Sequence, residues 1–201
     1  MKNIPISALI GLMFTGAYFF VAIAAPLIAP YGMAEVVGDV WEPASAKHLL
    51  GTDNIGRDLL TRMIYGGRTT IFIAAAATLL SFLTGTSLGL LAAVLGGWAD
   101  QVLSRAVDLV LSIPPLILAL VLLAIVPVTV PILILVMGLL DATRPYRLSR
   151  SVAVDINVMD YVEAAKLRGE GRTWIIFREI LPNALSPLVA EFGLRFIFMV
   201  L

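Results

Sequence analysis

The chain has 201 residues, of which 60% are hydrophobic and only 14% are charged, and its formal net charge is zero. Soluble globular domains carry about 25% charged residues, so this composition indicates an integral membrane protein with apolar spans. The zero net charge argues against nucleic acid as a partner. The absence of cysteine excludes disulfides and zinc-thiolate sites, and the single histidine, His48, argues against a histidine-based metal site. We expect neither a metal nor a cofactor.

The first apolar segment extends from about Ile6 to Ala29 and contains no charged residue. A helix needs about 20 apolar residues to cross a bilayer, so residues 1–30 are predicted to form an N-terminal transmembrane helix. No small-residue cleavage site precedes the next polar sequence, which predicts an uncleaved anchor. Residues 31–69 are polar and are predicted to form a loop that contains an amphipathic helix.

Residues 70–201 are predicted to form the core of the membrane domain. They begin with a second span at about 70–95, rich in alanine and glycine, which let helices pack closely. A polar step at 96–108 leads into 32 nearly uninterrupted apolar residues, 109–140, broken by PVTVP. Two full crossings require roughly 40 residues, so we predict a helical hairpin whose helices extend into the flanking sequence. A single span with a re-entrant segment is the alternative.

The last apolar segment begins near Ala184 and runs to Leu201 without the interfacial or charged residues that normally follow a crossing helix. We therefore expect at least one more helix beyond it. The polar loops hold unequal numbers of Lys and Arg, seven in 141–183 and four in 31–69. By the positive-inside rule, the N-terminus with Lys2, the 96–108 step and the 141–183 loop are predicted to be cytoplasmic, and the 31–69 loop external.

The cytoplasmic loop is predicted to contain two short helices. Asp160 is a candidate N-cap for the helix YVEAAKLR, and Gly169 and Gly171 are predicted to end it, because glycine adopts left-handed conformations without penalty. A second helix, TWIIFREIL, follows, and Pro182 is predicted to separate it from the last span. Two short helices at a bend form a knob suited to docking in a groove of another protein. A simple amphipathic surface loop is the alternative.

Six residues of this stretch match the EAA…G…LP loop of ABC-importer permeases in type and spacing, and the stretch resembles that loop: Glu163, Ala164, Ala165, Gly169, Leu181 and Pro182. In that family the loop forms the coupling helix, which sits in a cleft of the ATP-hydrolysing subunit. The resemblance implies that residues 150–183 form a cytoplasmic coupling loop whose EAA residues and glycine contact a partner ATPase.

A second stretch, HLLGTDNIGRDLLTRMIYGGRTT, resembles the external-loop signature of dipeptide/oligopeptide/nickel permeases, in the subunit type with a short external loop. It contains a turn-rich run followed by an amphipathic helix. Asp58 and Arg62 are four residues apart in the order that favours an ion pair, and Gly66-Gly67 is predicted to end the helix. His48 is expected to be a turn residue of this loop rather than a ligand.

A third stretch, GGWADQVLSRAVDLVLSIPPLILAL, resembles the entry of this family into its third span. Together the resemblances imply an all-α, polytopic membrane protein with the type I ABC importer transmembrane fold, with about five spans present of an expected six. They imply a permease subunit of the bacterial inner membrane that forms a path for peptides or similar small solutes. The implied partners are a second permease subunit, two ATP-binding cassette subunits, an external solute-binding protein and membrane lipid.

Charged residues at the edges of the apolar segments are further candidates. Glu191 and Arg195 lie four apart in the last span, where they are predicted to pair, and they are not what the family pattern leads us to expect there. Ionisable groups inside a bilayer favour a functional role, so the pair is a candidate for the translocation path, with a structural ion pair as the alternative. Four other residues are predicted to bridge helix ends across the hairpin at the cytoplasmic side: Arg105, Asp108, Asp141 and Arg144.

The sequence lacks the phosphate-binding GxxxxGK[ST] pattern, so coupling to ATP hydrolysis requires a partner. It also lacks a plausible Ser-His-Asp set, which argues against a membrane-embedded hydrolase and against an enzyme in general. A secondary transporter driven by an ion gradient remains the alternative function. Such folds show internal repeats, which are not evident here, and charged residues at the midplane, for which only Glu191 and Arg195 qualify.

Overall fold

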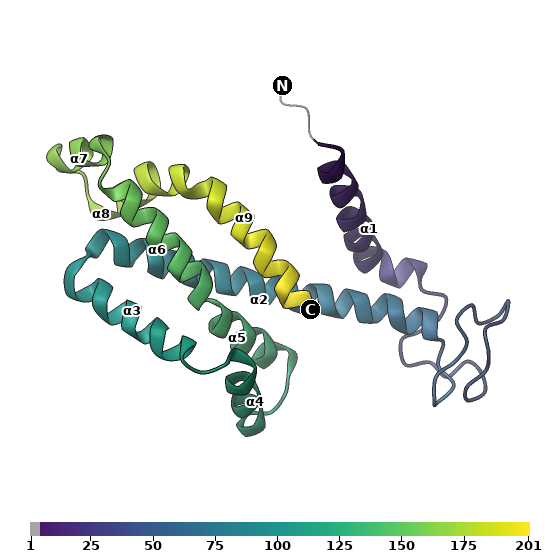
Figure 1. Ribbon diagram of the computed structural model, residues 1–201. Coiled ribbons are helices and arrows are strands. Elements are labelled where there is room, and N and C mark those ends of the chain that lie inside the picture. The colour runs from purple at the N-terminus through teal and green to yellow at the C-terminus, as the bar shows by residue number, and fades with distance from the viewer. Residues whose placement is uncertain (1–4) are drawn as a thin grey trace. The chain divides into compact units, whose positions relative to one another are not determined.

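The computed structural model describes residues 5–201, so the prediction that rests on Lys2 lies outside the described residues. Within this range the regular elements are all helical, and the only β-type pairings are two isolated bridges, which confirms the all-α prediction. In chain order the elements are α1 Ile6–Ile28, α2 Leu59–Leu95, α3 Gly97–Leu111, α4 Pro115–Ile125, α5 Val130–Asp141, α6 Thr143–Asn157, α7 Asp160–Leu167, α8 Arg172–Trp174, the π-helix η1 Ile175–Ile180 and α9 Leu181–Val200 (Figure 1).

The chain divides into two compact units, one ending at Phe72 and one extending from Ile73 to Leu201. In the first unit, α1 has 23 residues with a mean hydropathy of 2.1 and buries only Ala22 and Ala25. A helix that is apolar on every side requires an apolar environment, which agrees with a membrane-crossing anchor.

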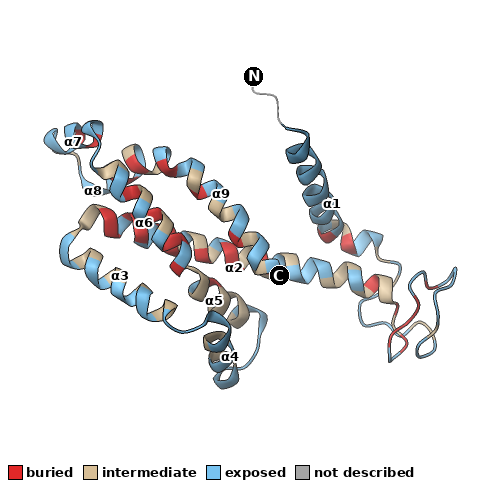
Figure 2. Cartoon of the chain, viewed as in Figure 1, coloured by how far each residue is buried: buried red, intermediate tan, exposed pale blue. Residues whose placement is uncertain are grey.

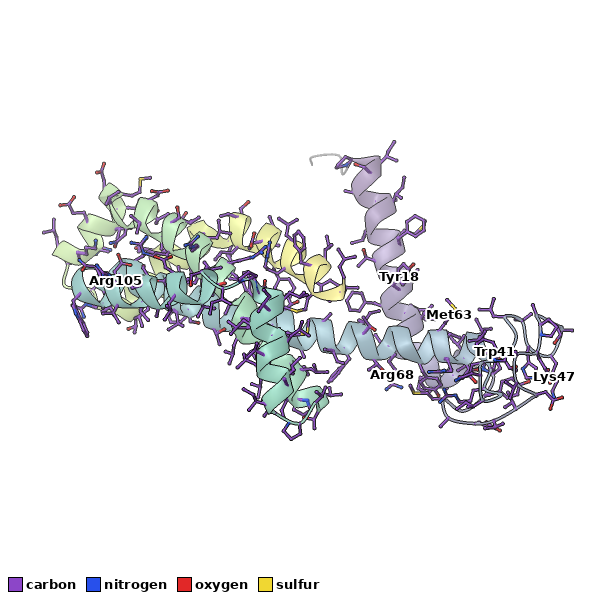
Figure 3. All side chains as sticks on the ribbon, turned by 60° about the horizontal axis from the view of Figure 1, so that its bottom comes forward. Tyr18, Trp41, Lys47, Met63, Arg68 and Arg105 are labelled. Carbon is purple, nitrogen blue, oxygen red and sulfur yellow. The ribbon has the colours of Figure 1, made fainter. Side chains whose placement is uncertain are left out.

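An apolar cavity of about 220 Å³ lies between α1 and the first turns of α2. Tyr18 lines it from α1, and Met63 and Arg68 line it from α2 (Figure 3).

Helix α2 is continuous for 37 residues, so the prediction that Gly66-Gly67 ends an amphipathic helix is wrong. Both glycines lack the positive φ angle of Gly169, which ends a helix later in the chain. A glycine inside a helix costs only about 1 kcal/mol relative to alanine, and the turns on both sides outweigh that cost. The predicted external helix and the second span therefore form one continuous helix.

The core of the second unit forms around the closely packed faces of α2, α5 and α6. Gly85 and Gly89 of α2 lie so close to the α6 backbone that an added Cβ would overlap the carbonyl oxygens of Ala142 and Tyr146 respectively. Gly138 of α5 approaches the Ala77 carbonyl in the same way. Small residues thus bring the backbones together, as expected for helices packed inside a membrane bundle. The buried positions concentrate where α2, α6 and the start of α9 meet (Figure 2).

The predicted hairpin is present as α4 and α5, which lie side by side across the 126–129 turn (Figure 1). The two helices have only 11 and 12 residues, too few for a crossing of about 20. Neither extends into its flank as predicted, since α4 begins at Pro115 and α5 ends at Asp141. Two full crossings and the alternative, a single span with a re-entrant segment, both stay predictions. Helix α3 bends by 84° into α4, at a break that ends in Pro114-Pro115, where the residue before a proline leaves the α region. Helix α5 leads directly into α6, because Ala142 between them keeps αR angles.

By length and composition, three helices of the described residues could cross a membrane, or four if the bent α3–α4 pair counts as one span. Helices α5 and α6 fall outside this count because they have only 12 and 15 residues. The number of five spans therefore stays a prediction. The polar 96–108 step and most of the 141–183 loop are helical rather than irregular.

Pro182 does not separate the second short helix from the last span, which corrects the sequence prediction. The chain from Arg172 to Val200 is one helical rod, and its middle is the π-turn η1. Proline lacks an N–H and its ring would clash with the carbonyl four residues earlier in a regular α-helix. The wider π-turn avoids this clash: the Leu181 N–H donates to Ile176, five residues back, and Asn183 Nδ2 donates to the Glu179 carbonyl at 2.6 Å.

Candidate functional site

The predicted knob is formed by α7 and the turn that follows it. Its N-cap is Met159, which makes no side-chain cap, so the prediction that Asp160 caps the helix is wrong. Asp160 and Glu163 instead lie in the first turn, where their negative charges complement the helix dipole. Gly169 has φ +84° and donates its N–H to Lys166, so it ends the helix as predicted. Gly171 has extended angles and begins α8 rather than ending α7.

The EAA residues point in two directions. Glu163 and Ala164 are exposed, whereas Ala165 is fully buried, as is Val162 one turn earlier. Positions three apart share a helix face, so Val162 and Ala165 hold α7 against its own unit. Val162 joins a buried cluster with residues of α2, α6 and η1: Leu90, Ala93, Ala153, Ile175, Ile176 and Ile180.

The other matched residues divide in the same manner. Gly169 is exposed, and an added Cβ there would meet no atom within 4 Å. Leu181 packs against the buried cluster, whereas Pro182 is exposed at the first turn of α9. The structure therefore places Glu163, Ala164 and Gly169 on an outward surface, and Ala165 and Leu181 against the interior.

Exposed apolar side chains surround the outward face of α7, and our sequence analysis missed them. Val158 is 74% exposed, Leu167 84% and Tyr161 42%. Single exposed apolar residues are ordinary on protein surfaces, but three at the two ends of an eight-residue helix form an apolar rim. Their presence in an otherwise polar loop could have indicated a contact surface from the sequence.

Ion pairs attach α3 to α6, with partners that differ from the predicted ones. Arg147 donates to Asp108 at 2.5 Å, and Arg150 binds Asp100 through two nitrogens. The hydroxyls of Ser104 and Tyr146 are 2.9 Å apart. Helix ends are thus bridged, but Asp108 pairs with α6 rather than across the α4–α5 hairpin.

Glu191 and Arg195 form the predicted pair, with Arg195 Nε 2.8 Å from Glu191 Oε1. Arg195 is only 6% exposed, and its guanidinium also lies 3.5 Å from Asp141 and 4.9 Å from the Phe198 ring centre. Ser81 of α2 donates to the same Asp141 at 3.1 Å. The cluster therefore connects α2, α5 and α9, and Asp141 belongs to it rather than to an interfacial bridge with Arg105 or Arg144.

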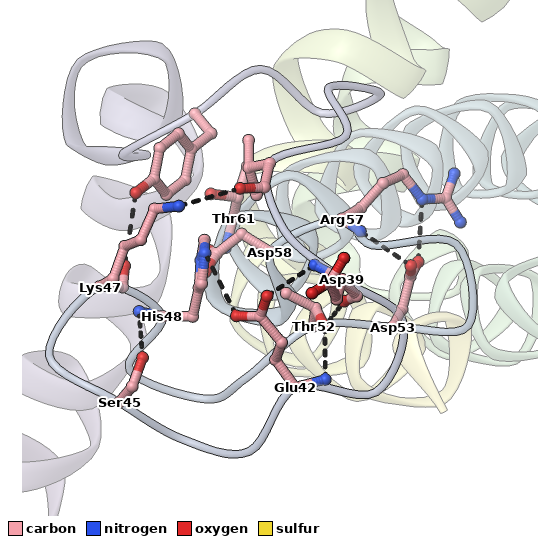
Figure 4. Close-up of polar contacts among 12 residues, drawn as sticks. Asp39, Glu42, Ser45, Lys47, His48, Thr52, Asp53, Arg57, Asp58 and Thr61 are labelled. Atoms are coloured by element: carbon pink, nitrogen blue, oxygen red, sulfur yellow. Dashed lines mark hydrogen bonds and ion pairs between the residues drawn. The ribbon is translucent and has the colours of Figure 1, made fainter.

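The segment between α1 and α2 is organised by buried acids (Figure 4). Asp58 accepts the Thr61 N–H at 2.8 Å, which caps α2, and contacts His48 Nδ1 at 3.2 Å. His48 is fully buried against Asp58, Glu42 and the Tyr31 ring, as a structural residue of the turn. The predicted ion pair between Asp58 and Arg62 is wrong, because the Arg62 guanidinium contacts Asp53 at 2.5 Å instead.

Asp53 is the centre of this segment. It accepts hydrogen bonds from the backbone of Ile55 and Arg57 and from the side chains of Arg57 and Arg62. Burial alone would raise the pKa of this carboxyl, but these four donors outweigh burial and lower its pKa. The pKa of Asp58 is also lowered, because hydrogen bonds from Thr61 and His48 outweigh the effect of burial.

Comparison with known proteins places this geometry in a family. The family described as binding-protein-dependent transport system inner membrane component matches residues 85–201, which include α7, η1, Asp141 and the Glu191–Arg195 pair. The chain is similar to the dipeptide transport system permease protein DppC of Haemophilus influenzae, with 37% identity over 191 residues, 92% of this chain. It is 38% identical to DppC of Escherichia coli over 197 residues, and 34% identical to the di/tripeptide permease protein DppC of Pseudomonas aeruginosa over 196, in both cases over 94% of this chain.

The chain spans 65% of the length of each of these three relatives. The family match covers more than half of the chain, and it includes the stretch that resembles the EAA…G…LP loop. The chain therefore belongs to the family of binding-protein-dependent transport system inner membrane components.

Proposed function

We propose that this chain is a permease subunit of a binding-protein-dependent ABC importer in the bacterial inner membrane. The observation that carries the proposal is the geometry of α7, a short helix anchored to its own unit by Val162 and Ala165 and presenting Glu163 and Ala164 outward. A rigid helix with one buried and one exposed face can transmit motion from a partner into a bundle.

The transported solute is a short peptide or a similar small solute. This proposal rests on the relatives, which are named as dipeptide or di/tripeptide permeases. The partners are two ATP-binding cassette subunits, one of which contacts α7, a second permease subunit that completes the path, and an external solute-binding protein near residues 31–69. The Glu191–Arg195 pair, of which Arg195 is buried, lies along the path together with Asp141.

Coupling is mechanical in this proposal. Closure of the ATPase subunits moves the 150–183 loop, and the rod from Arg172 to Val200 carries that motion to Arg195. The exposed residues Glu163, Ala164 and Gly169 make the contact, with Val158, Tyr161 and Leu167 as its apolar rim. Leu181 and Pro182 act at the junction between the coupling loop and α9 rather than at the partner surface.

The test uses the absence of cysteine in the chain. In the assembled transporter, Ala164→Cys is expected to cross-link to the ATPase subunit, with the captured protein identified by mass spectrometry. Ala165→Cys is the matched control, since it differs by one position but is fully buried, and it should give little cross-link. An active transporter in which neither position captures an ATPase would contradict the coupling role of α7.

The energy source for uptake distinguishes an ABC importer from a secondary transporter. Uptake through this chain and its partners is expected to stop on ATP depletion and to continue when a protonophore abolishes the ion gradient. The reverse result would favour an ion-driven transporter and would remove the basis of the proposal.

A further inference from the structure

A cavity of about 280 Å³ lies between the start of α4, the end of α5 and the end of α9. Its walls are mainly apolar, including Leu116, Met137, Leu140 and Phe198. Two charged residues of opposite sign also line it, Asp141 and Arg144. A largely apolar cavity with a few convergent polar groups is the usual form of a small-molecule site.

The two charged residues are close neighbours along the backbone. Asp141 ends α5 and Arg144 lies in the first turn of α6, with αR backbone at Ala142 between them. Residues three apart on such a backbone are neighbours, with Cβ atoms about 5–6 Å apart. The cavity therefore presents a carboxylate and a guanidinium side by side.

Contacts from α2 and α9 hold the Asp141 carboxylate in place. Ser81 donates to one of its oxygens at 3.1 Å, and Arg195 lies 3.5 Å from the other. Arg195 is closer to Glu191, at 2.8 Å, so it neutralises Asp141 only in part. Each carboxylate oxygen can accept two hydrogen bonds, which leaves Asp141 able to accept a further donor from the cavity.

Arg144 is free to bind an anion. It is exposed, and none of the ion pairs among residues 5–201 includes it. Two acids and two bases, Glu191, Asp141, Arg144 and Arg195, give the region no net formal charge. A ligand with one positive and one negative group fits this arrangement without leaving an unpaired charge in the cavity.

We propose that the Asp141–Arg144 cavity binds the two charged termini of a short zwitterionic peptide, the ammonium at Asp141 and the carboxylate at Arg144. The apolar walls receive the peptide's side chains without selecting among them. This inference rests on the proposed function and names the part of the permease that contacts the solute.

The test places a reporter in the cavity. Met137→Cys gives the otherwise cysteine-free chain one thiol there, and its rate of maleimide labelling is measured in the assembled transporter. Dialanine is expected to slow labelling, whereas N-acetyl-dialanine and dialanine amide, which each lack one terminal charge, should protect about tenfold less well. Leu135→Cys, on α5 but outside the cavity lining, is the control for effects of peptide elsewhere.

A second variant tests whether Arg144 binds the carboxylate of the peptide. Arg144→Gln in the Met137→Cys chain is expected to abolish the preference for dialanine over dialanine amide and to keep the preference over N-acetyl-dialanine. Arg105→Gln is the matched control, because Arg105 is also exposed and does not line the cavity.

Equal protection by all three peptides, or no protection at concentrations that saturate uptake, would overturn the site. ATP-driven uptake, measured in the same preparations, distinguishes a failure of the cavity proposal from a failure of the importer proposal. Its presence without selective protection rejects the cavity alone, whereas its absence from the unmodified chain rejects the importer function.

Discussion

At the scale of single residues, glycines of α2 fall into two groups with opposite roles. Gly85 and Gly89 lie where an added Cβ would overlap the α6 backbone, whereas Gly66 has no atom within 4 Å of that position. The first group sets how closely two helices approach, and the second adds only backbone freedom to an open stretch of helix.

We predict that Gly89→Ala destabilises the protein by about 1–3 kcal/mol, because the new methyl group overlaps the Ser149 hydroxyl and the Tyr146 carbonyl. Gly66→Ala should instead stabilise by about 0.5–1 kcal/mol, since alanine favours the helix and meets nothing. Thermal unfolding of the detergent-purified variants measures both. Equal effects of the two substitutions would show that α2 and α6 do not pack through Gly89.

The acids of the external segment predict a pH dependence at the same scale. The pKa of Asp53 and of Asp58 is lowered from the ordinary value of 3.8, so the folded segment holds these protons more weakly than the unfolded one. Their stabilisation is complete above pH 3.8 and is lost as the pH falls through the folded values. Limited proteolysis of residues 31–58 with an acid-active protease should therefore accelerate below that pH.

Asp53→Asn should make the same segment sensitive to proteolysis at neutral pH, because Arg57 and Arg62 lose their common carboxylate. Asp39→Asn is the control, since the Asp39 side chain is exposed. The loop contacts of this residue come from its backbone: the carbonyl accepts from the Thr52 hydroxyl and the N–H donates to Glu42. Resistance of the Asp53 variant equal to that of the Asp39 variant would contradict the central role of Asp53.

At the scale of elements, the important feature is the continuity of the rod from α8 through η1 to α9. The π-turn lets Pro182 stay inside a helix, so the end of the 150–183 segment and Arg195 lie on one continuous helix. Helix α7 is attached to this rod through Val162 and the buried isoleucines of η1. The turn between them depends on Gly169 and its left-handed backbone.

Gly169→Ala is therefore expected to impair coupling, since a left-handed backbone costs a residue with a Cβ about 1–2 kcal/mol. The expected phenotype is ATP hydrolysis with reduced uptake, measured in proteoliposomes. Gly171→Ala is the matched control two residues away, because Gly171 has φ −71°, which alanine adopts freely. Unchanged uptake per ATP hydrolysed in both variants would remove the role assigned to this turn.

At the scale of the whole molecule, the distribution of charge predicts the orientation. The 31–69 segment is expected outside and α7 inside, with the N-terminus cytoplasmic. In an otherwise cysteine-free chain, Ala46→Cys and Ala164→Cys report the two sides, and both positions are exposed. A membrane-impermeant maleimide should label Ala46→Cys in right-side-out vesicles and Ala164→Cys in inverted vesicles. Labelling of both positions from one side would contradict this topology.

Sequence reasoning succeeded where the signal is local or compositional. The first span, the left-handed glycine after α7 and the Glu191–Arg195 pair depend on neighbouring residues and were predicted. It failed where a local helix-ending signal lies inside a longer continuous helix. A double glycine did not end α2, and Pro182 did not end a helix, because the flanking turns and a π-turn compensated for both.

The sequence by itself determined the all-helical class, the membrane environment and the family motif, because each depends on composition or on residues close in the chain. The tertiary structure alone decided which EAA residues face outward, and that Asp141 pairs with Arg195 while Arg144 forms no ion pair within residues 5–201. Residues 54 positions apart meet only when α2, α5 and α9 pack together. Partner choice among several Arg and Asp residues is set by that packing, which no local pattern encodes.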